Sequence, residues 1–163
     1  MIKTIMLILL WGAAACAAGG VAFDETRYLY SIDKTLRFSG EIRFSDGGMQ
    51  IDYTKPEKRR IVYGGNRLEV FDADGGLMEE IDLDERPGMK LHMQFLLWLY
   101  RGDYDALKEY FTIERRGEEM DLHPIPPTDR VIASVNVVQE AQAPRVIKTV
   151  MSNGNEITIT IAR

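Results

Sequence analysis

Residues 36–70 read LRFSGEIRFSDGGMQIDYTKPEKRRIVYGGNRLEV, and the pattern of this stretch indicates the architecture of the chain. From Leu36 to Phe44, apolar and polar residues alternate with a period of two, which is typical of a strand with one buried face. Three further runs repeat the alternation, and Gly, Pro and Asn residues suited to tight turns separate them. The stretch therefore predicts four antiparallel strands whose shared apolar face must be covered by another part of the chain.

More runs of period two follow this stretch and extend the predicted sheet. We expect a fifth strand at 77–83, a hairpin over 111–123, and three final strands at 131–139, 145–151 and 156–162. A sheet of about nine or ten antiparallel strands must curl, close or stack to hide its apolar face.

Helical patterns interrupt the strands. Residues 89–102 read MKLHMQFLLWLYRG, which is apolar almost all round, so a helix here must be covered on most sides or face an apolar ligand. Asp103 is placed to cap a second helix that ends near Phe111, and Asp24 to cap a short helix within 23–34. We therefore expect a mainly β (α+β) fold, in which a curled antiparallel sheet or unclosed half-barrel carries an inserted helical lid.

Residues 1–22 have the layout of a secretory signal peptide. Lys3 precedes an apolar run, and a stretch of small residues then leads to Ala22. We expect cleavage after Ala22, with Ala17 as a second candidate, and a single domain over 23–163, since 163 residues suffice for one ordinary domain. The alternative is acylation of Cys16, which would make the protein a membrane-anchored lipoprotein.

Composition and spacing argue against two large classes of function. The formal net charge of −5 disfavours nucleic-acid binding, which requires a concentrated basic face. His92 lies in the apolar helical run and His123 directly precedes Pro124, without the spacing of metal ligands. No serine has the context of a nucleophile elbow. We expect no enzymatic activity, no cofactor and no metal.

Several segments, in order along residues 23–163, resemble the LolA family of periplasmic lipoprotein carriers and, more loosely, the related LolB family. They are FSGEIRF at 38–44, IDYTKPEKRRIVY at 51–63, LEVFDADGGLMEEIDL at 68–83, and MDLHPIPPTD at 120–129 followed by the C-terminal strand pair. The order and spacing of these segments carry the resemblance, because none of them is specific alone.

The resemblance implies an unclosed β-barrel covered by helices, with an apolar cavity for acyl chains. Such carriers take an acylated lipoprotein from a releasing transporter of the inner membrane and pass it to an acceptor at the outer membrane. It further implies a periplasmic location and a lid latch at Arg60, the arginine that follows Pro56, although the adjacent Arg59 leaves the register open. The chain is short and ends directly after its last strand, which leaves the cargo open to another lipid or glycolipid. We expect a monomer.

Apolar residues beyond the needs of a small lid are the candidates for the cavity. We assign Phe38, Ile42, Phe44, Met49, Ile51, Tyr53, Met89, Met93, Leu96 and Leu97. Each acyl CH₂ moved there from water gains about 0.8 kcal/mol, and thioether side chains adapt to mobile chains. Two alternatives remain: an outer-membrane-anchored acceptor, if Cys16 is acylated, and a non-enzymatic interaction module in which the same residues form a filled core.

Overall fold

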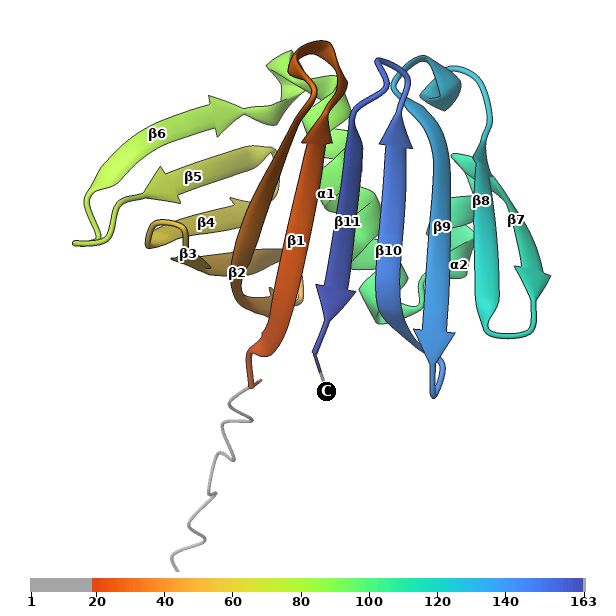
Figure 1. Cartoon of the computed structure of the whole chain (residues 1–163), viewed down its shortest axis with the longest axis horizontal. Helices are drawn as coiled ribbons and strands as arrows, with labels where there is room; N and C mark the ends of the chain where they lie inside the picture. Colours follow the sequence, from red (N-terminus) through yellow and green to blue (C-terminus); the bar gives the residue numbers. More distant parts are fainter. Residues whose placement is uncertain (1–18, 163) are drawn as a thin grey trace, which may run out of the picture.

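The computed structural model describes residues 19–162, and eleven strands in them form one antiparallel sheet. The spatial order is β6-β5-β4-β3-β2-β1-β11-β10-β9-β8-β7, so β6 and β7 are free edges and the sheet is not closed into a barrel (Figure 1). The predictions of a mainly β chain and of a curled, unclosed antiparallel sheet are confirmed.

The strands fall into two runs along the chain. The first run holds β1 (Val21–Leu29), β2 (Lys34–Ser45), β3 (Gly48–Lys55), β4 (Arg59–Gly64), β5 (Arg67–Phe71) and β6 (Leu77–Asp82). The second holds β7 (Phe111–Arg116), β8 (Glu119–Pro124), β9 (Ile132–Glu140), β10 (Ala143–Met151) and β11 (Glu156–Ile161). Short 3₁₀ turns lie at η1 (Tyr30–Ile32), η2 (Leu83–Glu85) and η3 (Thr128–Arg130).

The short helix expected within 23–34 is wrong, because this segment forms β1, followed by the turn η1. β1 lies between β2 and β11 and so joins the two halves of the sheet. Two of its inward-facing residues, Glu25 and Arg27, are charged. The sequence of β1 therefore lacks the regular alternation of apolar and polar residues that is typical of a strand with one buried face. β1 begins at Val21, one residue before the expected cleavage point at Ala22. Cleavage there stays a prediction.

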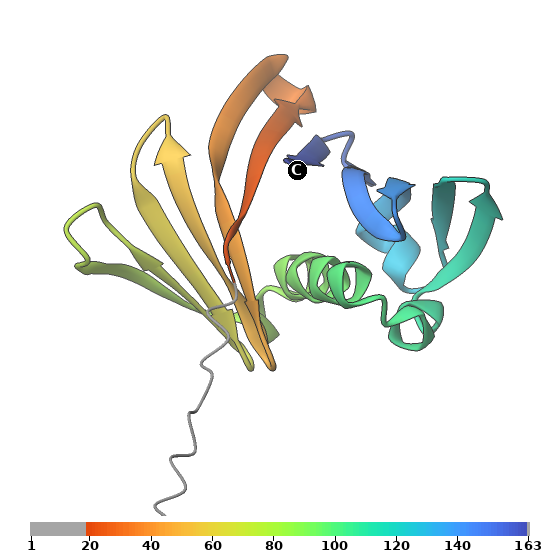
Figure 2. The same cartoon turned by 90° about the horizontal axis from the view of Figure 1, so that it is seen from below.

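Between the two runs of strands, the chain crosses the concave side of the sheet as a helix. α1 (Pro87–Arg101) leads from β6 at one free edge, through α2 (Tyr104–Lys108), to β7 at the other (Figure 2). Pro87 occupies the first turn, where a missing N–H costs nothing, and Gly102 ends the helix with a φ of 68°. The side chain of Asp103 accepts a hydrogen bond from the amide of Ala106 at 3.2 Å, which confirms the predicted cap of α2. Within residues 19–162, no helix has the length and apolarity needed to cross a membrane.

Burial is uneven between the two halves of the sheet. The most deeply buried strand residues lie on β7 to β10, among them Phe111, Met120, Leu122, Val135 and Val137. On the face of β2 to β5 that looks toward α1, the side chains keep slightly more exposure. Hereafter this face of the sheet is called the inner face, and the opposite one the outer face. The strand side chains of β7 to β9 are therefore the more completely covered, and the candidate site lies in the N-terminal half.

Candidate functional site

The predicted cavity residues gather on the inner face and on α1. On the sheet, Ile42 of β2 lies opposite Ile51 of β3, and Phe44 lies opposite Met49, so the alternation places them on one side. Nine of the ten belong to or pack against a single apolar cluster. Seven are buried, namely Ile42, Met49, Ile51, Tyr53, Met93, Leu96 and Leu97. Phe38 and Phe44 are half-buried, whereas Met89 at the start of α1 is 37% exposed and lies outside the cluster.

A recess of about 120 Å³ opens in the inner face beside two of these residues. Its walls are formed by Phe38, Tyr53, Ile61, Arg27 and Arg59, next to Pro56 and Glu57. Ligand pockets for drug-sized molecules usually enclose about 300–1,000 Å³, so this recess holds a small group and not an acyl chain.

A charged network lies at one wall of the recess. Glu25 is only 5% exposed, and its carboxylate accepts hydrogen bonds from Arg27 Nε and, at 3.0 Å, from the Tyr53 hydroxyl. Arg27 Nη2 donates to the same hydroxyl at 3.0 Å, and the guanidinium lies 4.7 Å from the centroid of the Phe38 ring. Burial works against the positive charge of Arg27, but Glu25 and Tyr53 outweigh it and raise the pKa of Arg27 above its ordinary value.

The sequence pattern did not indicate this network, because it predicted a helix over 23–34. Glu25 and Arg27 are two residues apart and lie on the same face only in a strand. Burial and the neighbouring Glu25 also raise the pKa of the Tyr53 hydroxyl, which therefore stays protonated and donates to Glu25. A buried ion pair adds little net stability on average.

His92 of α1 lies near this network. The side chain as a whole is half-buried, but its Nδ1 atom is fully buried and has no hydrogen-bond partner among the described residues. The imidazole ring contacts the Phe95 ring edge to face, with the ring centroids 5.1 Å apart. Burial, reinforced by the positive charge of Arg27, lowers the pKa of His92 to about 4. His92 is therefore neutral at pH 7.

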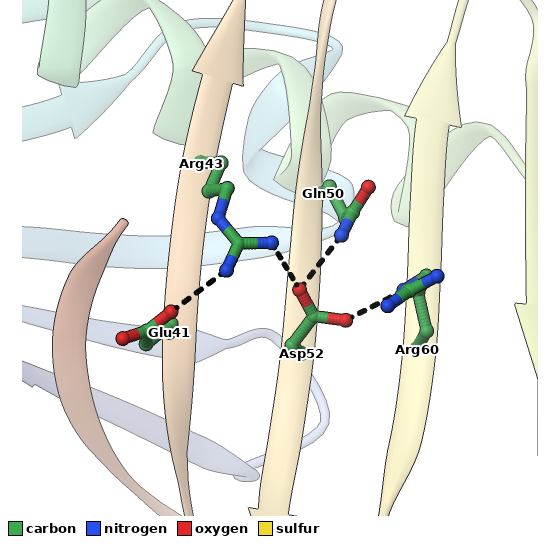
Figure 3. A network of polar contacts seen from close by, with 5 residues as sticks. All are labelled: Glu41, Arg43, Gln50, Asp52 and Arg60. Atoms are coloured by element: carbon green, nitrogen blue, oxygen red, sulfur yellow. Dashed lines mark hydrogen bonds and ion pairs between the residues drawn. The ribbon is translucent and has the colours of Figure 1, made fainter. Parts of the chain in front are cut away.

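Arg60, the expected lid latch, belongs to a polar network on the outer face (Figure 3). Arg60 Nε donates to Asp52 Oδ1 at 2.7 Å, while Arg43 Nη1 at 2.9 Å and Gln50 Nε2 at 2.7 Å donate to Asp52 Oδ2. Arg43 also donates to Glu41 at 3.0 Å. Partial burial opposes the charge of Asp52, but hydrogen bonds from Arg60 and Gln50 prevail and lower its pKa. Among the described residues, Arg60 thus bonds to the sheet and makes no polar contact with α1.

Register explains the side on which each arginine lies. Arg60 is opposite Asp52, whose side chain is on the outer face, whereas Arg59 is opposite Tyr53 and lines both the recess of the inner face and the polar hollow described next. A polar hollow of about 450 Å³ borders the Asp52 network on the outer face, between Arg43, Arg60 and the turn at 72–75. Its walls combine cations with the carboxylates of Asp52, Asp72 and Asp74.

Contacts at the end of α1 attach the helix to the sheet. The Tyr100 ring stacks on Phe44 with centroids 3.6 Å apart and planes 13° apart, and Arg101 Nη2 donates to the carbonyl of Ser45. Both contacts reach the turn between β2 and β3. The sequence placed Phe44 on the inner face but did not indicate that Tyr100 and Arg101 would meet this turn.

Neither the scan against protein-family models nor the search of curated proteins finds a match to this chain. Function is therefore inferred from the geometry above and from the resemblance seen in the sequence. Cys16, the candidate acylation site, lies outside the described residues.

Proposed function

We propose that this protein is a LolA-like periplasmic carrier that binds the acyl chains of lipoproteins on the inner face, beneath α1, and transfers them toward the outer membrane. The observation that supports this most is an unclosed, curled sheet whose concave side is crossed by one apolar helix, with the least exposed strand side chains on β7 to β9. The helix is the lid, and the less tightly packed N-terminal half is where a chain enters.

Separation of α1 from the sheet is feasible in free energy because the acyl chain would cover the apolar surface that the helix leaves. A chain of about fifteen CH₂ groups brings on the order of 10 kcal/mol of transfer free energy, which offsets the cost of separating α1 from the sheet. Met93, Leu96 and Leu97 are the α1 side chains that the chain would replace, since they are buried against the inner face.

Location and partners follow from the resemblance and from residues 1–22. In this proposal the protein is exported, receives its cargo from an inner-membrane transporter and delivers it to an outer-membrane acceptor as a monomer. Acylation of Cys16 would instead make it an anchored acceptor.

Binding of a fluorescent acyl probe tests the proposal. Phe44→Glu and Leu96→Glu each place a charge at the inner face and are expected to abolish binding, while circular dichroism reports whether the sheet remains folded. Thr158→Glu is the matched control, because Thr158 lies opposite Lys148 and Thr26 on the outer face. Unchanged binding in both folded inner-face variants would contradict the proposed location.

The small volume of the recess favours a second candidate, an interaction module with a filled core. Such a module would not take up bis-ANS, whereas a carrier binds the dye and releases it when fatty acid is added.

A further inference from the structure

We propose that the recess beside Arg27 binds the oxyanion, a carboxylate or a phosphate, of an anionic amphiphile whose acyl chain lies beneath α1. The inference rests on the proposed carrier function and specifies the chemical class of its cargo. A cavity for acyl chains alone needs no charge, yet this inner face holds Arg27 at one wall of its recess.

Arg27 is held in a fixed orientation. Nε bonds to Glu25, Nη2 bonds to Tyr53, and the guanidinium plane is supported by the Phe38 ring. Nη1 has no partner in the part of the chain that the structure describes, and Arg27 lines the recess. A guanidinium with one edge fixed and N–H groups left over is well prepared to bind an oxyanion.

Glu25 orients Arg27 without blocking it. Both carboxylate oxygens are occupied, Oε1 by Arg27 and Oε2 by Tyr53, and the side chain lies buried behind the guanidinium. Arg59 supplies a second cation at the recess, and its contact with Glu57 is loose at 3.7 Å. Since Glu57 is 79% exposed, Arg59 can turn toward a bound anion at little cost.

The volume of the recess is suited to the headgroup of the amphiphile and not to its acyl chain. The recess, at about 120 Å³, has room for an oxyanion but is well below the roughly 300–1,000 Å³ of pockets that enclose a whole drug-sized ligand. Phe38 and Tyr53 belong both to the recess and to the apolar cluster, so a chain attached to the oxyanion can continue along the inner face. On the helix side, His92 lies near Arg27, and its buried Nδ1 has no hydrogen-bond partner within residues 19–162.

Matched lipids test the inference with the whole protein. Displacement of bis-ANS is measured for palmitate, 1-palmitoyl-lysophosphatidate, hexadecanol and inorganic phosphate. We expect the two anionic lipids to bind at least about tenfold more tightly than hexadecanol, because they add charge-assisted hydrogen bonds. Preference for one of them identifies carboxylate or phosphate as the source of the oxyanion.

Arg27→Gln should reduce the affinity for anionic lipids to that for hexadecanol, whereas Arg43→Gln, on the outer face, should preserve the difference. Since Arg27→Gln leaves Glu25 buried without its cation, the double variant Glu25→Gln/Arg27→Gln provides a second test in which no buried charge is orphaned.

Binding of both anionic lipids no tighter than that of hexadecanol by the native protein would overturn the inference but leave the carrier function intact. Inorganic phosphate that competes as well as the lysophosphatidate would also overturn it, because the chain would then contribute nothing. Failure of every lipid to bind would instead refute the carrier function itself.

Discussion

Two histidines of this chain lie in different environments, and the environment of His92 makes stability depend on pH. Burial of the His92 ring on α1 lowers its pKa to about 4, whereas His123 on β8 is exposed beside Glu114. Because the unfolded chain binds the His92 proton near pH 6.5 and the folded chain only near pH 4, this residue's contribution to stability is complete above pH 6.5 and is lost as the pH falls toward 4.

Urea denaturation at pH 7.5 and pH 4 checks this prediction. His92→Leu should reduce the loss of unfolding free energy between the two pH values by up to about 3 kcal/mol, since each pKa unit corresponds to about 1.36 kcal/mol. His123→Gln, a histidine replacement at an exposed position of β8, is the control. An identical pH dependence in His92→Leu and the native protein would show that His92 is not protonated on unfolding in this range.

Neighbouring glycines at the turn between β2 and β3 differ sharply in the space around them. A Cβ on Gly48 would lie 1.9 Å from the carbonyl oxygen of Tyr63, whereas a Cβ on Gly47 would meet nothing within 4 Å. Because backbone cannot yield as a side chain does, Gly48→Ala should lower the unfolding free energy by about 3 kcal/mol, and Gly47→Ala by less than about 0.5 kcal/mol. Thermal denaturation of both variants measures this, and similar melting temperatures would contradict the close approach of β3 and β4.

At the scale of elements, the last turn of α1 attaches this helix to the sheet. Tyr100→Ala removes the stack on Phe44, and aromatic pairs of this kind contribute about 0.5–1.5 kcal/mol beyond their buried area. Amide hydrogen exchange at the end of α1 should therefore become about two- to tenfold faster. Tyr30→Ala, at an exposed position of η1, is the control. If exchange in α1 is equally fast in both variants, the stack does not hold the helix.

Sequence patterns predicted most elements because the apolar period is explicit in them. The four strands within 36–70, the apolar helix, the cap at Asp103 and the C-terminal strands are all confirmed. β1 was missed because its inward positions carry Glu25 and Arg27, whose shared partner Tyr53 lies far away in the sequence. Charge inside an apolar face becomes visible only when the strands are paired.

The alternation of apolar and polar residues predicted which side chains of the candidate site lie on the inner face, but not how they are arranged there. Alternation assigned residues such as Ile42 and Ile51 to the inner face correctly. It could not give the space left beneath α1, which depends on how closely the helix approaches the sheet. It also could not decide between Arg59 and Arg60, because a cation that follows a turn can face either side until the register of β3 and β4 is known.

At the scale of the whole molecule, uneven packing predicts uneven stability. β8 and β9 carry fully buried side chains, whereas β6 is an edge strand with almost every residue exposed. Native-state hydrogen exchange should therefore be slowest in β8 and β9 and fastest in β5 and β6, since sparsely buried elements open at low free energy. Equal protection of the two regions would contradict this division of the sheet.

Native mass spectrometry tests most directly whether the inner face carries acyl cargo. The protein is exported from a Gram-negative host under its own N-terminal segment, and one sample is measured in native and in denatured form. We predict a lipid adduct in the native spectrum alone, with a denatured mass that begins at Phe23; a mass that begins at an acylated Cys16 would indicate the anchored acceptor. A protein that remains free of lipid, even after incubation with palmitate and lysophosphatidate, would contradict the carrier function.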